Sequence, residues 1–330
     1  MSSRPIGVRR LRTAIAAAVA LMNLQSNEQQ VRLDAIQILR GSLQQEVRTA
    51  LVDIANNDSD AKVKQQAQFA LDSIEQLASR ESGNVRICFN GDFNWFNKSL
   101  EDFVHINQRV LNHDCILGNV EAELGEPLDV ADCGCAYPEN VDQGVVDRSN
   151  FIHTELKRCA QQQPELLDRL LQKPFFARYS VGELNVAVVH GDGDSLAGWR
   201  FDPAHLKQTD EAPWRAALFE KAQVNVFASS HTCSAAFHHE PLPNGQTGLI
   251  SNNGAAGMPS AQMDGLFTRI SMTSLNNPAL VFQSTQLNGV WIEQVRVQFD
   301  QAAWQQHFLG QWPEGTAAHT SYFTRISEGV

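Results

Sequence analysis

The sequence predicts an α/β protein in which a small helical region precedes a larger domain built around a sheet. The first observation is a set of four short apolar runs, rich in β-branched and aromatic residues, which are typical of buried strands. The second is that stretches with helical spacing separate these runs, as in proteins whose helices cover a sheet. The third is that residues 1–82 show helical spacing throughout.

The change from helical to strand spacing near residues 81–84 divides the chain into predicted domains of residues 1–82 and 83–330. We expect the second domain to run strand, helix, strand, long loop, helix, strand, helix and strand. The expected helices cover 99–111, 149–171 and 212–222, and later strands cover 281–282 and 290–297. The polar and aromatic segment from about 305 to 330 is expected to be a tail that folds over a pocket or an interface.

An internal repeat is the main feature of residues 1–82. The apolar residues that recur after 32 positions are Val31, Ala35 and Leu39, repeated as Val63, Ala67 and Leu71. Paired helices with this period resemble HEAT repeats, which bury their apolar faces by stacking on neighbours. Because two copies are few, we expect the segment to pack against the main domain or a protein partner. A simple helical lid is an equally good interpretation.

The N-terminus loosely imitates a signal peptide, because Arg9, Arg10 and Arg12 precede an Ala-rich stretch. That stretch lacks a clear cleavage site and continues into helical spacing, so a cytoplasmic protein is the preferred prediction. No run is long enough to span a membrane. The net charge is −11, and the acidic excess falls after residue 82. An acidic domain repels the phosphate backbone of a long nucleic acid, so we do not expect such a partner. Small substrates held by bound cations are compatible with this charge.

Six cysteines in 330 residues do not resemble the disulfide scaffold of a small secreted domain. Cys88 and Cys115 lie in predicted strands and are expected to pack in the core. The pair in Cys133-Gly134-Cys135 is expected to be reduced thiols in a loop, with a structural zinc site as the less favoured alternative.

Each of the four apolar runs ends in side chains that can bind a metal. The four segments are Val85–Asn94, Cys115–Asn119, Val186–Asp192 and Val224–Cys233. Four such endings suggest that a sheet directs its strand ends at a single pocket.

The order of these segments resembles the calcineurin-like metallophosphoesterases over about residues 84 to 300. That family carries GDxH, GD, GNH, a lone His after a hydrophobic strand, and GHxH. The corresponding segments here are Gly91–Asn94, Leu117–Asn119, Arg148–Phe151, Val189–Asp192 and Ser230–Cys233. The resemblance implies a four-layer αββα sandwich with two mixed sheets.

The resemblance also implies two divalent metal ions, with Mn, Fe or Zn as candidates. A metal-bound hydroxide would attack the phosphorus of a small phosphomonoester or phosphodiester. One metal would contact Asp92, Asn94, Asn119 and Cys233. The second would contact Asn119, Asn150, His190 and His231.

The chain departs from the family pattern at four positions. Asn94 and Cys233 stand where the family has His, and Asn119 stands where it has the bridging Asp. Glu121, or less favourably Asp114, is expected to supply the missing carboxylate. Phe151 occupies the place of the proton-donating His, so His153 is the predicted replacement, with His238 and His239 further along the chain.

The loop beyond His190 offers further candidates. Arg200 could clamp a phosphate with its planar guanidinium, and Trp199 could stack on a substrate ring or anchor the loop. The small residues of 252–259 suit a pocket wall or a tight turn.

Two functions follow from these features. The favoured one is a metal-dependent phosphoesterase with an altered ligand set. The alternative is a weakly active or inactive binding or scaffold protein on a phosphoesterase fold, with residues 1–82 as its partner surface.

Overall fold

The computed structural model of the chain describes residues 19–39, 85–130, 132–258, 265–297 and 299–329, together with positions 47, 50, 51, 53–55, 58 and 59. Its contacts divide the chain into two compact units, Met1–Val85 and Arg86–Val330, each considered by itself below. None of the helices in the described part of the chain is long and apolar enough to cross a membrane.

In the first unit, helix α2 (Gln29–Leu39) contributes to a small apolar core. Ala35 and Leu39 from α2 are buried there with residues on both sides of it along the chain. Arg32 pairs with Asp58 at 2.7 Å. The second copy of the predicted repeat, at positions 63, 67 and 71, lies outside the described residues, so the HEAT-like arrangement stays a prediction.

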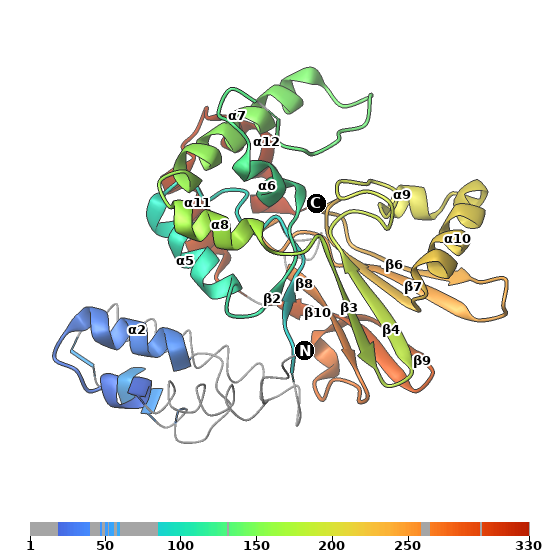
Figure 1. The fold of residues 1–330 in the computed structure, drawn as a ribbon, viewed down its shortest axis with the longest axis horizontal. Coiled ribbons are helices and arrows are strands. Elements are labelled where there is room, and N and C mark those ends of the chain that lie inside the picture. Colours follow the sequence, from blue (N-terminus) through green and yellow to red (C-terminus); the bar gives the residue numbers. More distant parts are fainter. Residues whose placement is uncertain are drawn as a thin grey trace, which may run out of the picture. The chain divides into compact units, whose positions relative to one another are not determined.

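A five-stranded mixed sheet is the centre of the second unit (Figure 1). Its order is β3-β4-β5-β7-β6, and its strands are β3 (Phe176–Val181), β4 (Leu184–Val189), β5 (Val226–Ser229), β6 (Ala236–Pro241) and β7 (Thr247–Asn252). Strands β4, β5 and β7 are parallel. His190 follows β4 and His231 comes two residues after β5, so both lie at the same edge of the sheet.

Both faces of this sheet are covered. Side chains such as Phe227 and Ile250 pack toward α10 (Ala212–Ala222) and α9 (Pro203–Leu206). Their neighbours along the strands, such as Val226 and Leu249, pack on the second sheet, because successive side chains point to opposite faces. That sheet is antiparallel in the order β8-β10-β9, with β8 (Gly265–Ser271), β9 (Val281–Leu287) and β10 (Val290–Val297). The complete four-layer arrangement stays a prediction.

The first two predicted strands are much shorter than expected. Strand β1 covers Cys88–Phe89 and pairs in parallel with β2, Asp114–Cys115. The chain leaves β1 at Gly91 and Asp92, which have φ values of +92° and +57°. A strand cannot continue through left-handed backbone, so Asp92 lies on a turn.

Helices gather on the other side of this unit (Figure 1). They are α5 (Leu100–Val110), α6 (Asn119–Ala122), α7 (Gln143–Ala160) and α8 (Pro164–Leu171), and the short 3₁₀ helix η1 (Glu123–Gly125) follows α6 directly. The predicted helix at 99–111 is confirmed, and Ser99 caps it by accepting the N–H of Asp102. The predicted stretch 149–171 is two helices, because Pro164 begins a new one.

The segment predicted to be a polar tail belongs to the core of this unit. It forms α11 (Gln301–Gln311) and α12 (Ala317–Glu328). Phe308, Trp312 and Tyr322 pack with Phe96 and Ile152 in one apolar cluster. Two further 3₁₀ helices, η2 (Thr209–Glu211) and η3 (Pro278–Leu280), lie in connecting loops.

Candidate metal centre

Two glycine turns bring the loop after β1 against the loop after β2. A Cβ atom on Gly91 would lie 2.3 Å from the backbone nitrogen of Gly118. A Cβ on Gly118 would lie 2.1 Å from Oδ1 of Asp92, so neither position has room for a side chain. That same Oδ1 accepts the backbone N–H of Val120 at 3.0 Å. The Asp92 carboxylate is therefore fixed between the two turns.

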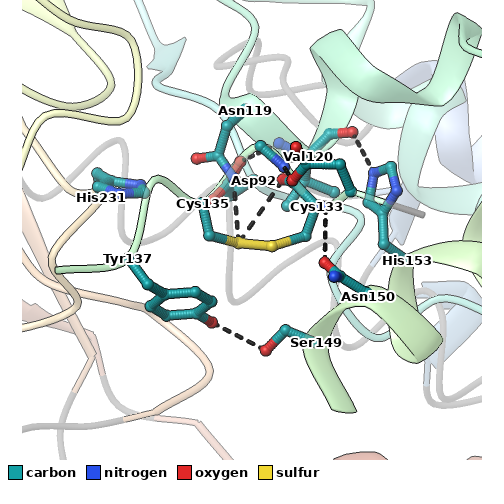
Figure 2. Close-up of a disulfide and its surroundings, with 12 residues drawn as sticks. Asp92, Asn119, Val120, Cys133, Cys135, Tyr137, Ser149, Asn150, His153 and His231 are labelled. Carbon is teal, nitrogen blue, oxygen red and sulfur yellow. Dashed lines mark hydrogen bonds between the residues drawn. A yellow bond between two sulfur atoms is a disulfide. The ribbon is translucent and has the colours of Figure 1, made fainter. Parts of the chain in front are cut away.

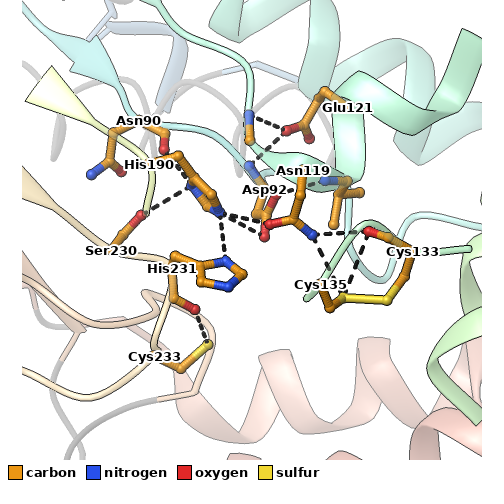
Figure 3. A network of polar contacts seen from close by, with 12 residues as sticks. Asn90, Asp92, Asn119, Glu121, Cys133, Cys135, His190, Ser230, His231 and Cys233 are labelled. Atoms are coloured by element: carbon orange, nitrogen blue, oxygen red, sulfur yellow. Dashed lines mark hydrogen bonds and ion pairs between the residues drawn. A yellow bond between two sulfur atoms is a disulfide. The ribbon is translucent and has the colours of Figure 1, made fainter. Parts of the chain in front are cut away.

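Four polar side chains converge at this edge of the five-stranded sheet (Figure 3). Nε2 of His190 lies 3.0 Å from Oδ2 of Asp92 and 3.1 Å from Oδ1 of Asn119. It also lies 3.1 Å from Nδ1 of His231. Candidate ligand atoms of Asp92, His190 and His231 all lie within 4.8 Å of one another. His190 and His231 are almost fully buried.

With a neutral His190, these four side chains have too few protons for their contacts. Nδ1 of His190 faces the backbone oxygen of Asn90 at 2.7 Å, which in the neutral imidazole places the proton there and leaves a lone pair on Nε2. Nδ2 of Asn119 donates to the backbone oxygen of Cys133 at 2.9 Å, so Oδ1 faces His190. A proton on Nδ1 of His231 would satisfy only the contact with Nε2 of His190, and the contacts of that nitrogen with Asp92 and Asn119 would still lack a proton. A divalent cation fits this set, because carboxylate, amide and imidazole are all metal ligands.

The pKa values of these side chains also indicate that the cluster favours a positive charge. Burial alone would raise the pKa of the Asp92 carboxyl, but His190 and His231 hold it below its usual value. Burial also opposes a charge on His190, yet Asp92 raises the pKa of that imidazole. Burial and the neighbouring His190 lower the pKa of His231 to about 4. The cluster therefore favours one positive charge and resists a second proton.

Glu121 does not point at the cluster as a substitute bridging ligand, so that expectation is wrong. Its Oε2 accepts the backbone N–H of Asp92 at 2.6 Å and that of Gly118 at 3.2 Å. Its Oε1 accepts the backbone N–H of Asn94 at 3.1 Å. Burial, followed by the nearby charge of Asp92, raises the pKa of Glu121 to about 7. Glu121 therefore joins the two turns through their backbone.

Asp114, the other candidate for the missing carboxylate, is also occupied elsewhere. It accepts the hydroxyl of Tyr179 at 3.0 Å and lies on the exposed side of β2. Asn94 is turned away from the cluster too. It exchanges side-chain hydrogen bonds with Asn107 and donates to Glu121.

Asn150 and Cys233 were predicted ligands that the structure does not bring to the cluster. Asn150 lies inside α7, where its Oδ1 accepts the backbone N–H of Cys133 at 3.1 Å. The thiol of Cys233 faces the backbone oxygen of His231 at 3.5 Å. Burial raises the pKa of this thiol, although the adjacent Arg325 opposes the shift. Cys233 is not among the side chains whose candidate ligand atoms lie together.

The two residues predicted to act on the substrate also have other partners. Nε2 of His153 contacts the backbone oxygen of Val120 at 2.9 Å, and burial lowers the pKa of this imidazole. Arg200 pairs with Glu211 at 3.2 Å, and its guanidinium carbon lies 3.5 Å from the ring centroid of Trp214. The alternative proton donors, His238 and His239, lie on β6 and contact Glu240 and Thr285.

Cys133 and Cys135 form a disulfide, so the predicted free thiols are wrong (Figure 2). The two half-cystines are buried beside Asn119. Trp199 donates its Nε1–H to the backbone oxygen of Cys135 at 3.0 Å. The Trp199 ring lies 5.1 Å from the ring of His231 and edge-on to it. Trp199 therefore anchors its loop over the cluster, in line with one of its two predicted roles.

A small hollow of about 170 Å³, which includes space open to solvent, lies beside Cys233. Most of its lining comes from the segment predicted to form a pocket wall, including Asn253, Gly254 and Ala255. Gly254 has a φ of +66°, and a Cβ there would lie 3.0 Å from the backbone oxygen of Cys233. The small residues therefore allow the backbone at Gly254 to approach the backbone of Cys233 closely.

Asn119 is a predicted ligand that the structure does bring to the cluster, since its amide oxygen lies beside Nε2 of His190.

No family model and no curated protein matches this sequence. Among solved structures, a hypothetical protein from Pyrococcus horikoshii OT3 is similar, with a TM-score of 0.51 and 12% identity, over 79% of this chain and 92% of that chain. A metallophosphoesterase from Sphaerobacter thermophilus matches with a TM-score of 0.44 and 16% identity, over 78% of this chain and 93% of that chain. The first likeness shows a shared fold only, and the second is too distant to add to it.

Proposed function

We propose that this chain is a metal-dependent phosphoesterase that binds one divalent ion through Asp92, Asn119, His190 and His231. The observation that carries the proposal is the convergence of one carboxylate, one amide oxygen and two imidazoles on a single point. The order of the sequence patterns supports a phosphoester as the substrate class. The mixed imidazole and oxygen donors suit Mn²⁺, Fe²⁺ or Zn²⁺.

The chain's own residues prepare this site before any ligand arrives. A bound divalent ion would supply a Lewis acid for the phosphoryl oxygens and would lower the pKa of a coordinated water. Asp92 contributes the negative charge, and Asn90 fixes the tautomer of His190. Cys133 orients the amide of Asn119, and Trp199 shields one face of His231.

One ion, instead of the two expected from the sequence, follows from what surrounds the cluster. Asn94 is committed to Asn107 and Glu121, and the thiol of Cys233 faces the backbone oxygen of His231. Neither is free to hold a second cation. The substrate is proposed to be a small phosphorylated molecule, because the chain's charge of −11 opposes a long nucleic acid. A protein partner for residues 1–82 remains part of the proposal.

Elemental analysis of protein purified without chelator or nickel tests the proposal directly. We expect about one metal per chain in the wild type and almost none in His190→Ala, His231→Ala. The matched control is His238→Ala, His239→Ala, which removes two histidines outside the cluster and should keep the metal. The loaded protein should hydrolyse aryl phosphomonoesters or phosphodiesters, and the first double variant should not.

The alternative, a binding or scaffold protein on the same fold, is favoured by one observation. Phe151 is half exposed on α7, and His153 is held by a backbone carbonyl, so the usual place for a proton donor lacks one. Metal binding without hydrolysis of any ester tested would support this alternative. Absence of metal in the wild type, even after Mn²⁺ or Zn²⁺ is added, would contradict both versions of the metal site.

A further inference from the structure

The segment Cys133-Gly134-Cys135, called the CGC segment below, lies directly on the metal ligand Asn119. Nδ2 of Asn119 donates to the backbone oxygen of Cys133 at 2.9 Å and lies 3.5 Å from Sγ of Cys135. A Cβ atom on Gly134 would lie 3.3 Å from the Cβ of Asn119. Cys133 and Cys135 therefore both contact the Asn119 side chain, as Figures 2 and 3 show, and Gly134 leaves no room for a side chain of its own beside it.

The CGC segment is also fixed from its other sides. The backbone N–H of Cys133 donates to Asn150 of α7 at 3.1 Å. Trp199 donates to the backbone oxygen of Cys135 at 3.0 Å, and its ring packs on His231. The disulfide closes a short ring around Gly134, whose φ of +63° is available to glycine at little cost. The ring thus holds the Cys133 oxygen and the Cys135 sulfur in one orientation toward Asn119.

We propose that the Cys133–Cys135 disulfide is a positioning group for Asn119, so that its reduction weakens metal binding. An amide oxygen binds a cation well only when the amide is held in the correct orientation, and partners of this kind are typically worth about 10- to 100-fold in metal affinity. With the ring open, the Cys133 oxygen is no longer tied to the Cys135 sulfur, and the amide can rotate. This inference rests on the proposed metal site and adds a redox dependence to it.

The reduction step balances with a water-soluble phosphine as the reductant. Phosphorus attacks one sulfur, the S–S bond breaks, and the two electrons from phosphorus pass to the sulfurs. Water then supplies the oxygen of the phosphine oxide and the two protons of the thiols. A phosphine is preferable to a dithiol here, since a dithiol would itself bind many metals.

The experiment compares Mn²⁺ affinity before and after phosphine treatment, with thiol counts by mass after alkylation. We expect four free thiols before treatment, six after it, and a loss of at least about tenfold in affinity. Cys133→Ser, Cys135→Ser should show the weak affinity without treatment, which covers a disulfide that resists reduction. Cys88→Ser is the matched control and should behave as the wild type.

A second experiment tests whether reduction of the disulfide lowers the metal affinity through Asn119. In Asn119→Ala the affinity should already be low, and phosphine should change it no further. An equal loss on reduction in this variant would overturn the positioning role. Six free thiols in the untreated protein, or unchanged affinity in the double serine variant, would overturn the inference while leaving the metal site intact. A wild type that binds no Mn²⁺ would instead refute the proposed function itself.

Discussion

Two carboxyl groups near the cluster, of the partly exposed Asp92 and the buried Glu121, have opposite tasks because their surroundings differ. Asp92 faces two imidazoles, which favour its charged form and outweigh its burial. Burial and the negative charge of Asp92 raise the pKa of Glu121 to about 7, against the opposing effect of the backbone N–H groups that it accepts. Asp92 is therefore the better ligand, while Glu121 is suited to join the two turns. Sequence position alone did not separate these roles.

The raised pKa of Glu121 predicts a pH dependence of stability. Folding favours the protonated carboxyl, so its contribution is full below the ordinary value of 4.5 and is lost as the pH rises through about 7. A shift of this size corresponds to roughly 3 kcal/mol. We expect the metal-free wild type to lose about that much unfolding free energy from this group between about pH 4.5 and about pH 8, measured by urea unfolding with a chelator.

Glu121→Gln removes this titration, so its stability should vary less with pH by a similar amount. Glu126→Gln, at an exposed carboxyl five residues on, is the control and should keep the wild-type profile. If Glu121→Gln and the wild type show the same dependence, Glu121 does not titrate between these limits.

At the scale of elements, the sequence predicted best what is determined locally. Helix α10 covers the predicted residues 212–222, and strand β10 covers the predicted 290–297. Helix α5 carries its own cap at Ser99. The C-terminal helices were missed because the apolar residues of α11 do not gather on one face, so they give little helical spacing in the sequence. Their side chains pack on Phe96, a partner some two hundred residues away in the chain.

The disulfide between Cys133 and Cys135 could not be predicted from the sequence either. A C-x-C pair has the same sequence whether it is reduced, metal-bound or oxidised. The pairing depends on the loop before α7 being held between Asn119 and Asn150. Stable disulfides are more common in oxidising compartments than in the cytoplasm, so the cytoplasmic location stays a prediction that this bond does not favour.

Trp312 tests whether the C-terminal helices belong to the core. Its side chain is 1% exposed, and its Nε1–H donates to the backbone oxygen of Phe96 at 3.0 Å. Trp312→Ala should lower the unfolding free energy by about 3–5 kcal/mol, because it leaves a cavity and an unpaired carbonyl. Glu314→Ala, on the exposed turn beyond it, should change stability by less than about 0.5 kcal/mol. Similar small losses in both variants would mean that α11 and α12 are dispensable for folding.

At the scale of the whole molecule, the four proposed ligands join distant parts of the chain. Asp92 comes from the turn after β1 and Asn119 begins helix α6, while His190 and His231 come from the edge of the five-stranded sheet. Their convergence brings the helical side of the Arg86–Val330 unit against its sheets. An unfolded chain cannot present the same set, so a bound ion must stabilise the folded state.

This linkage has an expected size. At a free Mn²⁺ concentration of about 100 times the dissociation constant, the gain in unfolding free energy is about 2.7 kcal/mol. The six tryptophans all lie after residue 85, so tryptophan fluorescence during urea unfolding reports the Arg86–Val330 unit alone. The wild type should gain this amount on adding Mn²⁺, and His190→Ala, His231→Ala should gain almost nothing. An equal gain in both proteins would place the ion outside the cluster, because nothing else in that variant differs.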